Sequence, residues 1–477
     1  MPDPQTLLWS FEMFARRFVL VNLIFGLIVF CPDIKAQDPE ILPEQPGLNL
    51  SAGTDYAVPN TLPDDLIDPQ SLTSGGDAAS AAPTPPGPSP FGVTGDWLGL
   101  RTSLLERGIN LRTNFSQFYQ GVTSGGLNQE FAYGNKFDYF GVLEMEKLLG
   151  LKGMLVNLHG ESRFAQSVNR LDGALLPSNF ALQFPQGSGS NSALTNMQIQ
   201  QFLSPNFVVT VGKINTADGV NIHPFMGGYG TDRFMNTAFI RNPLCGRSIP
   251  YSTPGAGFSY LKNFDPVFTF LIVDPMGKPY TTGLGDLFSN GVSLFTQLRI
   301  PVKPADLPGH QSVEVTWSNG KFSPLSGDDY IIIPGEGLIA KKQTGSWAVN
   351  YGFDQFVLHS SETPGKGWGL FGNISIADQQ TNPINWFMNI GLAGTNLLPS
   401  RPNDSFGMAY FYMGVSNALQ KTLSPYLPVG NEQGFEVYYN ASITKWFQMT
   451  IDLQAMDTAR SDAASCLLFG LRGKIIF

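Results

Sequence analysis

The sequence is poor in charged residues, cysteine and histidine, and it lacks a long apolar run. Charged residues make up 14% of its 477 residues, well below the roughly 25% that is typical of soluble globular domains. Its main apolar run, "FVLVNLIFGLIVF" (18–30), has thirteen residues, too few for the roughly 20-residue helix that spans a bilayer. Three cysteines and four histidines provide neither a disulfide framework nor a zinc-binding spacing. This composition is unusual for a cytosolic enzyme, and it excludes a helical membrane protein.

Motifs for catalysis are also missing. The chain contains no G-x-S-x-G, no H-E-x-x-H and no phosphate-binding loop, and "GGYG" (227–230) is an isolated glycine turn. We therefore predict that the protein is not an enzyme and that it has no catalytic residues, no metal site and no cofactor. The alternative is an enzyme with an unrecognised Ser and His pair.

The first 90 residues form two segments of different composition. Arg16 and Arg17 precede the apolar run and a small-residue cleavage site follows at Ala36, so we interpret 1–36 as a signal peptide; the alternative is a membrane anchor. Residues 37–90 hold eleven prolines and eight acidic residues but no Lys or Arg, which predicts a disordered acidic linker. The rest of the chain holds 27 of the 38 acidic residues and 26 of the 29 basic ones, so its net charge is close to zero.

Beyond these segments, apolar and polar side chains alternate with a period of two. In "GFEVYYNASIT" (434–444), for example, Phe435 and Val437 oppose Glu436 and Asn440, as in a β-strand with two unlike faces. About sixteen such stretches are predicted, near 109–122, 137–147, 153–164, 196–203, 206–214, 255–263, 265–273, 290–300, 311–318, 345–358, 367–378, 384–393, 405–416, 434–444, 446–456 and 465–477.

Short connections between these stretches alternate with long ones, which include 165–195, 215–254 and 319–344. Short turns at one end and long extracellular loops at the other are typical of a bacterial outer-membrane barrel. A strand of about ten residues tilted by about 40° rises roughly 26 Å, which matches an apolar band of ~25 Å. We therefore predict an all-β fold over 91–477, a transmembrane antiparallel barrel of about 16 strands, rather than a soluble sandwich.

A short helix is predicted before the first strand. In "TGDWLGLRTSLLERGI" (94–109), Asp96 is placed to cap a helix and Gly108 to end it; the alternative is a plain surface helix. Outward-facing aromatic residues near strand ends are expected to form the interfacial girdles of the barrel. They are Tyr119, Tyr139, Trp347, Tyr351, Trp386 and Phe477.

Several motifs in order resemble the carbohydrate-selective porin family, OprB. They are "TGDWLGLRTSLLERGINLRTNFSQFYQGVTSGG" (94–126), "VGKINTADGV" (211–220), "FMNTAF" (234–239), "RPNDSFGMAYFYMGVSNAL" (401–419), "NEQGFEVYYNASITKWFQMTIDLQ" (431–454) and the terminal "LLFGLRGKIIF". The resemblance covers about 91–477, and it implies a sixteen-stranded barrel in the outer membrane of a Gram-negative-type bacterium, with Gly95 to Trp97 in a periplasmic helix. The terminal Phe477 also resembles the signature by which barrel assembly machinery recognises such proteins.

The predicted lumen lining carries charges of both signs, which argues against a pore that steers phosphate. Arg, Glu, Asp and Asn side chains can replace the water around sugar hydroxyls, so we predict passive diffusion of small neutral carbohydrates such as glucose. The alternatives are a general small-solute porin and a structural envelope anchor that uses the acidic linker. For each of these charged residues, the alternative to sugar contact is pairing across strands, which stiffens the wall. Lipid is an expected partner, nucleic acid is not, and both a monomer and a homotrimer remain open.

The longest connection, 215–254, is predicted to fold inward and to constrict the pore. It is rich in Phe and Met, which disfavours full exposure, and a barrel of this size needs something to narrow it for a monosaccharide. The alternative is an outer loop that shields the mouth. The predicted site comprises Phe225 and Phe234 as apolar anchors, Asp218, Asp232, Arg233, Arg241 and Arg247 as polar loop groups, and Glu144, Glu161, Arg163 and Lys213 on the wall.

Two cysteines remain after the predicted cleavage, Cys245 in this loop and Cys466 on the inward face of the last strand. They can meet if the loop folds in, so a disulfide and two buried thiols are both open at this point.

Overall fold

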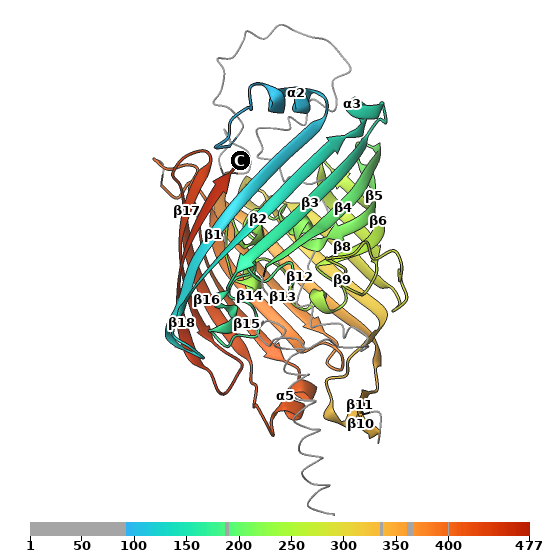
Figure 1. Ribbon diagram of the computed structural model, residues 1–477, viewed down its shortest axis with the longest axis vertical. Coiled ribbons are helices and arrows are strands. Elements are labelled where there is room, and N and C mark those ends of the chain that lie inside the picture. The colour runs from blue at the N-terminus through green and yellow to red at the C-terminus, as the bar shows by residue number, and fades with distance from the viewer. Residues whose placement is uncertain (1–91, 187–189, 334–336, 360–365, 399) are drawn as a thin grey trace, which may run out of the picture.

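Sixteen of the described strands form one closed antiparallel barrel (Figure 1). The computed structural model describes residues 92–186, 190–333, 337–359, 366–398 and 400–477, so the predicted signal peptide and acidic linker lie outside the described residues. The barrel strands are β1 (Ile109–Gly126), β2 (Phe131–Glu144), β3 (Met154–Ala165), β4 (Asn191–Ser204), β5 (Phe207–Asn215), β6 (Ser252–Lys262), β7 (Asp265–Val273), β8 (Ser293–Val302), β9 (Gly309–Phe322), β12 (Gln343–His359), β13 (Gly367–Ala377), β14 (Ile384–Thr395), β15 (Ser405–Val415), β16 (Glu432–Ser442), β17 (Phe447–Asp457) and β18 (Ala464–Ile476).

The predicted fold class and all sixteen predicted strands are confirmed. The second strand is shifted: it was predicted over 137–147 but runs over 131–144, and Met145–Leu149 form helix α3 instead. Glu146, within the predicted strand range, is therefore an exposed helical residue. Gly150 ends this helix with a φ of 72°, a left-handed conformation that glycine adopts without steric cost.

The barrel closes between its first and last strands, as the alternation of the last strand predicted. Asn114 pairs with Ile476 and Val122 with Leu468, and the backbone N–H of Phe477 donates to Thr113 at 2.8 Å. Closure leaves no unpaired strand edge, which is the condition for a β-structure to lie in lipid.

The two faces of the wall differ as the sequence pattern predicted. Outward side chains such as Tyr119, Tyr139, Trp347 and Tyr351 are exposed, whereas inward polar residues such as Asn350 are buried. An outward apolar face and an inward polar face are expected for a barrel with lipid outside and water inside.

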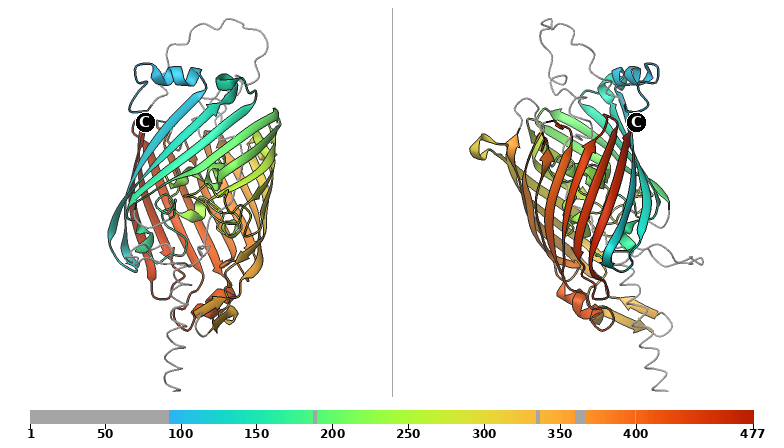
Figure 2. Two further views of the ribbon diagram at one scale, coloured as in Figure 1. Left: turned by 45° about the vertical axis from the view of Figure 1, so that its right-hand side comes forward. Right: turned by 90° about the vertical axis from the view of Figure 1, so that its left-hand side faces the viewer.

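The two ends of the barrel carry different elements (Figures 1 and 2). One end carries the C-terminus, α3 and helix α2 (Leu100–Glu106). The N-cap of α2 is Gly99 and not Asp96 as predicted, but the Asp96 carboxylate accepts from the backbone N–H of Thr102 in the first turn at 2.8 Å. The other end carries the small sheet of β10 (Tyr330–Ile333) and β11 (Gly337–Ala340) and helix α5 (Asn417–Leu423). Among the described residues, we find no helix with the length and hydropathy needed to cross a bilayer.

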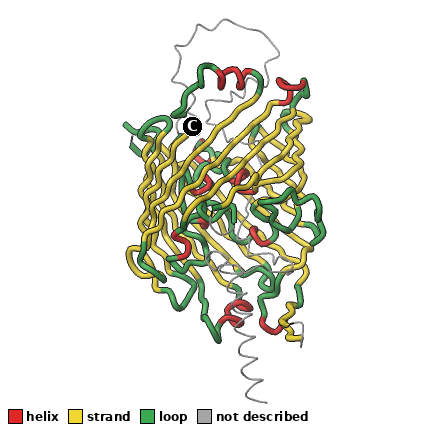
Figure 3. Tube along the Cα trace, in the orientation of Figure 1, coloured by secondary structure: helices red, strands yellow, loops and turns green. Residues whose placement is uncertain are grey.

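Short helical turns and irregular segments lie inside the wall of strands (Figure 3). They belong mainly to 166–186, the described part of the connection between β3 and β4, and to 216–251, between β5 and β6. The remaining short helices are α4 (Thr216–Val220), η2 (Val168–Arg170), η3 (Gly228–Gly230), η4 (Thr237–Phe239), η5 (Cys245–Arg247), η6 (Pro304–Asp306) and η7 (Gly327–Asp329).

Candidate pore constriction

The connection 216–251, here called the lumen loop, lies within the barrel (Figure 2). Its residues are buried except for two short stretches, 221–224 and 232–233, which are intermediate in exposure. This placement agrees with the inward fold that its Phe and Met content predicted. The loop fills space that a sixteen-stranded wall would otherwise leave to water.

Aromatic side chains attach the lumen loop to one side of the wall. The Phe225 ring lies 4.8 Å from that of Phe356 on β12. The Phe234 ring lies 4.9 Å from Tyr438 on β16 and 5.7 Å from Phe371 on β13. Both loop rings are at most 1% exposed, so the structure places them as apolar contacts with the wall and gives them little surface for a solute.

Glu436 of β16 and Arg472 of β18 bind the backbone of the same loop. The Glu436 carboxylate accepts from the backbone N–H groups of Met235 at 2.5 Å and Asn236 at 2.9 Å. The Arg472 guanidinium donates to the carbonyls of Gly230 and Arg233, both at 2.9 Å. Hydrogen bonds from the ionised Arg472 guanidinium are stronger than neutral ones, and together with the two bonds to Glu436 they hold the middle of the loop against the wall.

A buried ion-pair network on β2 and β3 lies across the lumen loop; we call Lys136, Asp138, His159 and Glu161 the β2–β3 clamp. The Lys136 ammonium is 2.6 Å from Glu161 and 3.2 Å from Asp138, and all three side chains are at most 1% exposed. Ligand atoms of Asp138, His159 and Glu161 lie within 4.8 Å of one another, a spacing that also suits a metal ion. Because Lys136 already supplies the positive charge between the carboxylates, the group is an ion-pair network rather than a metal site.

The β2–β3 clamp holds both ends of the lumen loop. Near the start of the loop, Asp218 accepts from His159 at 2.8 Å, and Asn215 donates to Glu161 at 3.1 Å. At its end, the Tyr251 hydroxyl donates to Glu161 at 2.6 Å. The ends are therefore fixed by buried polar contacts with β2 and β3, and the middle is fixed by β16 and β18, another part of the wall.

The described part of a second connection, 166–186, also folds inward, which was not predicted from the sequence. Its backbone N–H groups at Leu175 and Leu176 donate to the Glu432 carboxylate at 2.6 and 2.9 Å. The backbone N–H of Phe180 donates to Met235 of the lumen loop at 2.8 Å. The segment "LDGALLPSNFALQF" (171–184) has an apolar content that could have indicated burial, as it did for the longer loop.

Asp232 and Arg233 are the charged residues of the lumen loop that keep access to solvent. The Asp232 side chain is 38% exposed, and its carboxylate pairs with the Lys474 ammonium of β18. Burial raises the pKa of Asp232, but the positive charges of Lys474, Arg472 and Arg112 together more than offset this effect, so that the pKa lies below its usual value. Arg233 donates to the carbonyls of His223 and Met226. These side chains and 221–224 form the accessible edge of the loop.

The comparisons with known proteins agree with this architecture. The family model described as carbohydrate-selective porin, OprB family, matches residues 128–477. This chain belongs to that family. Porin B of Pseudomonas aeruginosa is 23% identical over 404 residues, which cover 76% of this chain and 86% of that protein.

Two solved structures of Pseudomonas putida OprB share the fold, and each comparison covers 81% of this chain and 98% of the other. The high-pH structure is 20% identical with a TM-score of 0.68, and the low-pH structure is 17% identical with a TM-score of 0.50. The protein is therefore an OprB-family, carbohydrate-selective porin of the Gram-negative outer membrane, and it is not an enzyme.

Most of the other residues predicted at the porin constriction are buried in contacts with protein. Arg241 is 1% exposed, with its guanidinium 5.6 Å from the centre of the Tyr251 ring. Arg247 donates to the carbonyl of Thr381 at 2.7 Å, and Arg163 donates to that of Leu182 at 2.7 Å. These side chains hold loops and walls together in the structure, as Asp218 and Glu161 do.

Two predicted wall residues lie away from the lumen loop, which corrects the prediction. Lys213 shares the outward face of β5 with Val211, because its partner on β4 is the exposed Met197. Its ammonium donates to the carbonyls of Pro279 and Thr281, at 2.8 and 2.9 Å. Glu144 ends β2 and pairs with Lys147 at 2.8 Å, with side-chain exposures of 39% and 48%, so it lies at the pore mouth.

The two cysteines are buried and free, so the disulfide that the sequence left open is not formed. Cys466 lies against the second inward loop, where its sulfur is 4.0 Å from the carbonyl oxygen of Asp172.

Proposed function

We propose that this porin passes small neutral sugars such as glucose by passive diffusion through a water-filled passage that the lumen loop narrows. The observation that carries this proposal is the double attachment of the loop, at both ends to the β2–β3 clamp and at its middle to β16 and β18. A loop held in this way presents a fixed edge, which selectivity by shape requires.

The accessible edge favours neutral solutes over ions of one sign. Asp232 and Arg233 carry opposite charges, and Arg112 on β1 and Lys474 on β18 lie on the wall beside Asp232. A mixed set of charges produces no strong field of one sign. It does supply donors and acceptors that can replace water around the hydroxyl groups of a sugar.

Among the predicted contact residues, we assign direct sugar contact to Asp232 and Arg233 because they combine charge with solvent access. Arg241, Arg247, Asp218, Glu161 and Arg163 are proposed to act indirectly, by positioning the loops. We also propose, from the sequence alone, that residues 1–36 are a cleaved signal peptide and that residues 37–90 are an acidic linker.

The test is deletion of residues 222–248, followed by recording from planar bilayers with glucose as a blocker of ionic current. Because the deletion removes the tethered part of the loop, single-channel conductance should rise severalfold and block by glucose should vanish. If conductance and block both stay at the level of the intact porin, the constriction lies elsewhere and the proposal is wrong.

Selectivity is tested separately in liposomes that carry the intact porin. Swelling should be faster in glucose than in an amino acid of similar size, since weak millimolar binding, equivalent to roughly 4 kcal/mol, assists permeation. Equal rates would leave a general diffusion porin as the better description.

A further inference from the structure

Three successive inward side chains of β1 hold buried polar atoms that make no hydrogen bond within the described part of the chain; we call Arg112, Asn114 and Ser116 the β1 polar row. The atoms are Nε of Arg112, Oδ1 of Asn114 and Oγ of Ser116. Asn114 and Ser116 are at most 3% exposed, whereas Arg112 keeps partial access to solvent. A buried polar group without a partner is unfavourable, so the row is suited to receive a polar ligand.

Arg112 lies near the start of β1, which begins at the end of the barrel that carries α2 (Figure 1). It is the register partner of Phe140 on β2, and its Cζ atom lies 4.9 Å from the centre of the Phe140 ring. The ring face attracts the positive charge. It offers no oxygen lone pair to the planar N–H fork of the arginine, however, so the fork is suited to an oxygen ligand.

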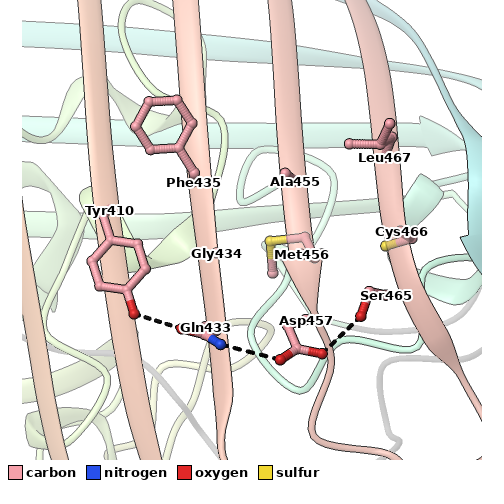
Figure 4. A pocket seen from close by; sticks show the side chains of 10 residues that line it. All are labelled: Tyr410, Gln433, Gly434, Phe435, Ala455, Met456, Asp457, Ser465, Cys466 and Leu467. Carbon is pink, nitrogen blue, oxygen red and sulfur yellow. Dashed lines mark hydrogen bonds between the residues drawn. The ribbon is translucent and has the colours of Figure 1, made fainter.

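Cations of β18 face the lumen near this row. Phe435, Ala455 and Leu467 are register partners on β16, β17 and β18, and they line a pocket on the outer face of the wall (Figure 4). Successive side chains of a strand point to opposite faces. Arg472 and Lys474, five and seven residues beyond Leu467 in an uninterrupted register, therefore point inward.

The acidic groups near Arg112 are already paired with other cations. Asp138 lies 3.2 Å from the Lys136 ammonium, and Asp232 of the lumen loop pairs with Lys474. Among the described residues, Arg112 therefore brings one positive charge to this edge for which the protein supplies no further carboxylate. A ligand with a single negative charge balances it.

We propose that this site binds sugar acids, which are sugars with one carboxylate such as uronates, and that a bound sugar acid blocks the passage of neutral sugars. The carboxylate matches the planar fork and the charge of Arg112. Side chains on one face of a strand follow one another at roughly 7 Å, so a hydroxyl of the same ligand can donate to Asn114. Another hydroxyl can donate to Asp232, whose side chain is 38% exposed.

The inference rests on the proposed function for the position of the passage, and it adds a ligand with different behaviour. A neutral sugar binds weakly and leaves quickly, which passage requires. A hydrogen bond between two ionised groups is roughly twice as strong as a neutral one, so a sugar acid stays longer and obstructs the pore. A small anion without hydroxyls fits less well, because Asn114 Oδ1 and the Asp232 carboxylate both need a donor.

The experiment compares glucuronate with glucose as blockers of ionic current in planar bilayers, at constant ionic strength. The two compounds share one ring and differ in a carboxylate that replaces a hydroxymethyl group. Half-block by glucuronate should need a concentration about tenfold lower, as expected for one added charge-assisted hydrogen bond. Acetate, a carboxylate without hydroxyls, should not block at that concentration. Uptake of labelled glucose into liposomes should fall when glucuronate is added.

One variant assigns the preference to Arg112. Arg112→Gln should reduce the ratio of the two half-block concentrations from about ten to about one, because the amide carries no charge. The matched control is Arg107→Gln, which removes an exposed arginine directly after α2 at the same end of the barrel. This control should keep the ratio at about ten, which separates a local site from a general effect of charge at the mouth.

Four results would overturn the inference. If glucose blocks the intact porin and glucuronate blocks no better, the inference is wrong and the proposed function stands. Block by acetate at the glucuronate concentration would show a general anion site. A ratio that stays near ten in Arg112→Gln would place the carboxylate elsewhere. Glucose uptake that glucuronate leaves unchanged would place the bound sugar acid outside the passage.

Discussion

Lys136→Met should destabilise the barrel strongly, because it leaves two buried carboxylates without their cation. The Lys136 side chain is 0% exposed and lies 2.6 Å from Glu161 and 3.2 Å from Asp138. Removal of one partner from a buried ion pair costs about 3–5 kcal/mol in the free energy of unfolding. The side chains of Lys and Met have similar length, so little of this loss comes from packing.

The matched control is Lys147→Met, in helix α3 directly after the same strand. Lys147 pairs with Glu144 at 2.8 Å, but the two side chains are 48% and 39% exposed. An exposed pair contributes at most about 1 kcal/mol. Urea unfolding in detergent micelles, followed by tryptophan fluorescence, should therefore give a clearly lower midpoint for Lys136→Met than for Lys147→Met.

The same variant should also loosen the lumen loop, because Glu161 accepts from Tyr251 at the end of that loop. Open-channel current noise should rise in Lys136→Met and not in Lys147→Met. Addition of Glu161→Gln to Lys136→Met removes one of the uncompensated charges and should restore part of the stability. If Lys136→Met unfolds at the same urea concentration as Lys147→Met, the clamp does not hold the loop as argued.

Three further predictions concern the lumen loop. Arg233→Ala should weaken glucose block with little change in conductance, because its side chain lies at the accessible edge; an unchanged block constant would remove Arg233 from the contact set. Arg241→Ala should instead raise current noise, since the buried Arg241 packs on Tyr251; quiet channels with weaker block would mean direct sugar contact. Although His223 belongs to the accessible edge, its side chain is only 13% exposed, and this burial lowers its pKa to about 3, so the docked loop binds fewer protons than a released one. The contribution of neutral His223 to the free energy of loop docking is fully present above about pH 6.5. It decreases as pH falls, by about 2 kcal/mol at pH 5. Noise should therefore grow between pH 7.5 and pH 5, and His223→Gln should remove that growth.

The sequence by itself determined the strands and their two faces. Lipid outside and water inside impose opposite demands on successive side chains, so the alternation of Phe435 and Glu436 is visible in the printed sequence. The inward fold of the lumen loop was also predictable, because Phe225 and Phe234 are too apolar for an exposed flap.

The tertiary structure alone decided which charged residues keep solvent access. Glu161, Asp218 and Arg241 have the same chemistry as Asp232 and Arg233, but the first three are buried by contacts between distant segments. Such contacts depend on how two inward loops pack against the wall and on each other, as Phe180 and Met235 do. The alternation of apolar and polar residues predicts which side chains of a strand point inward. It does not predict which of these inward side chains the loops cover, so their burial could only be seen in the tertiary structure.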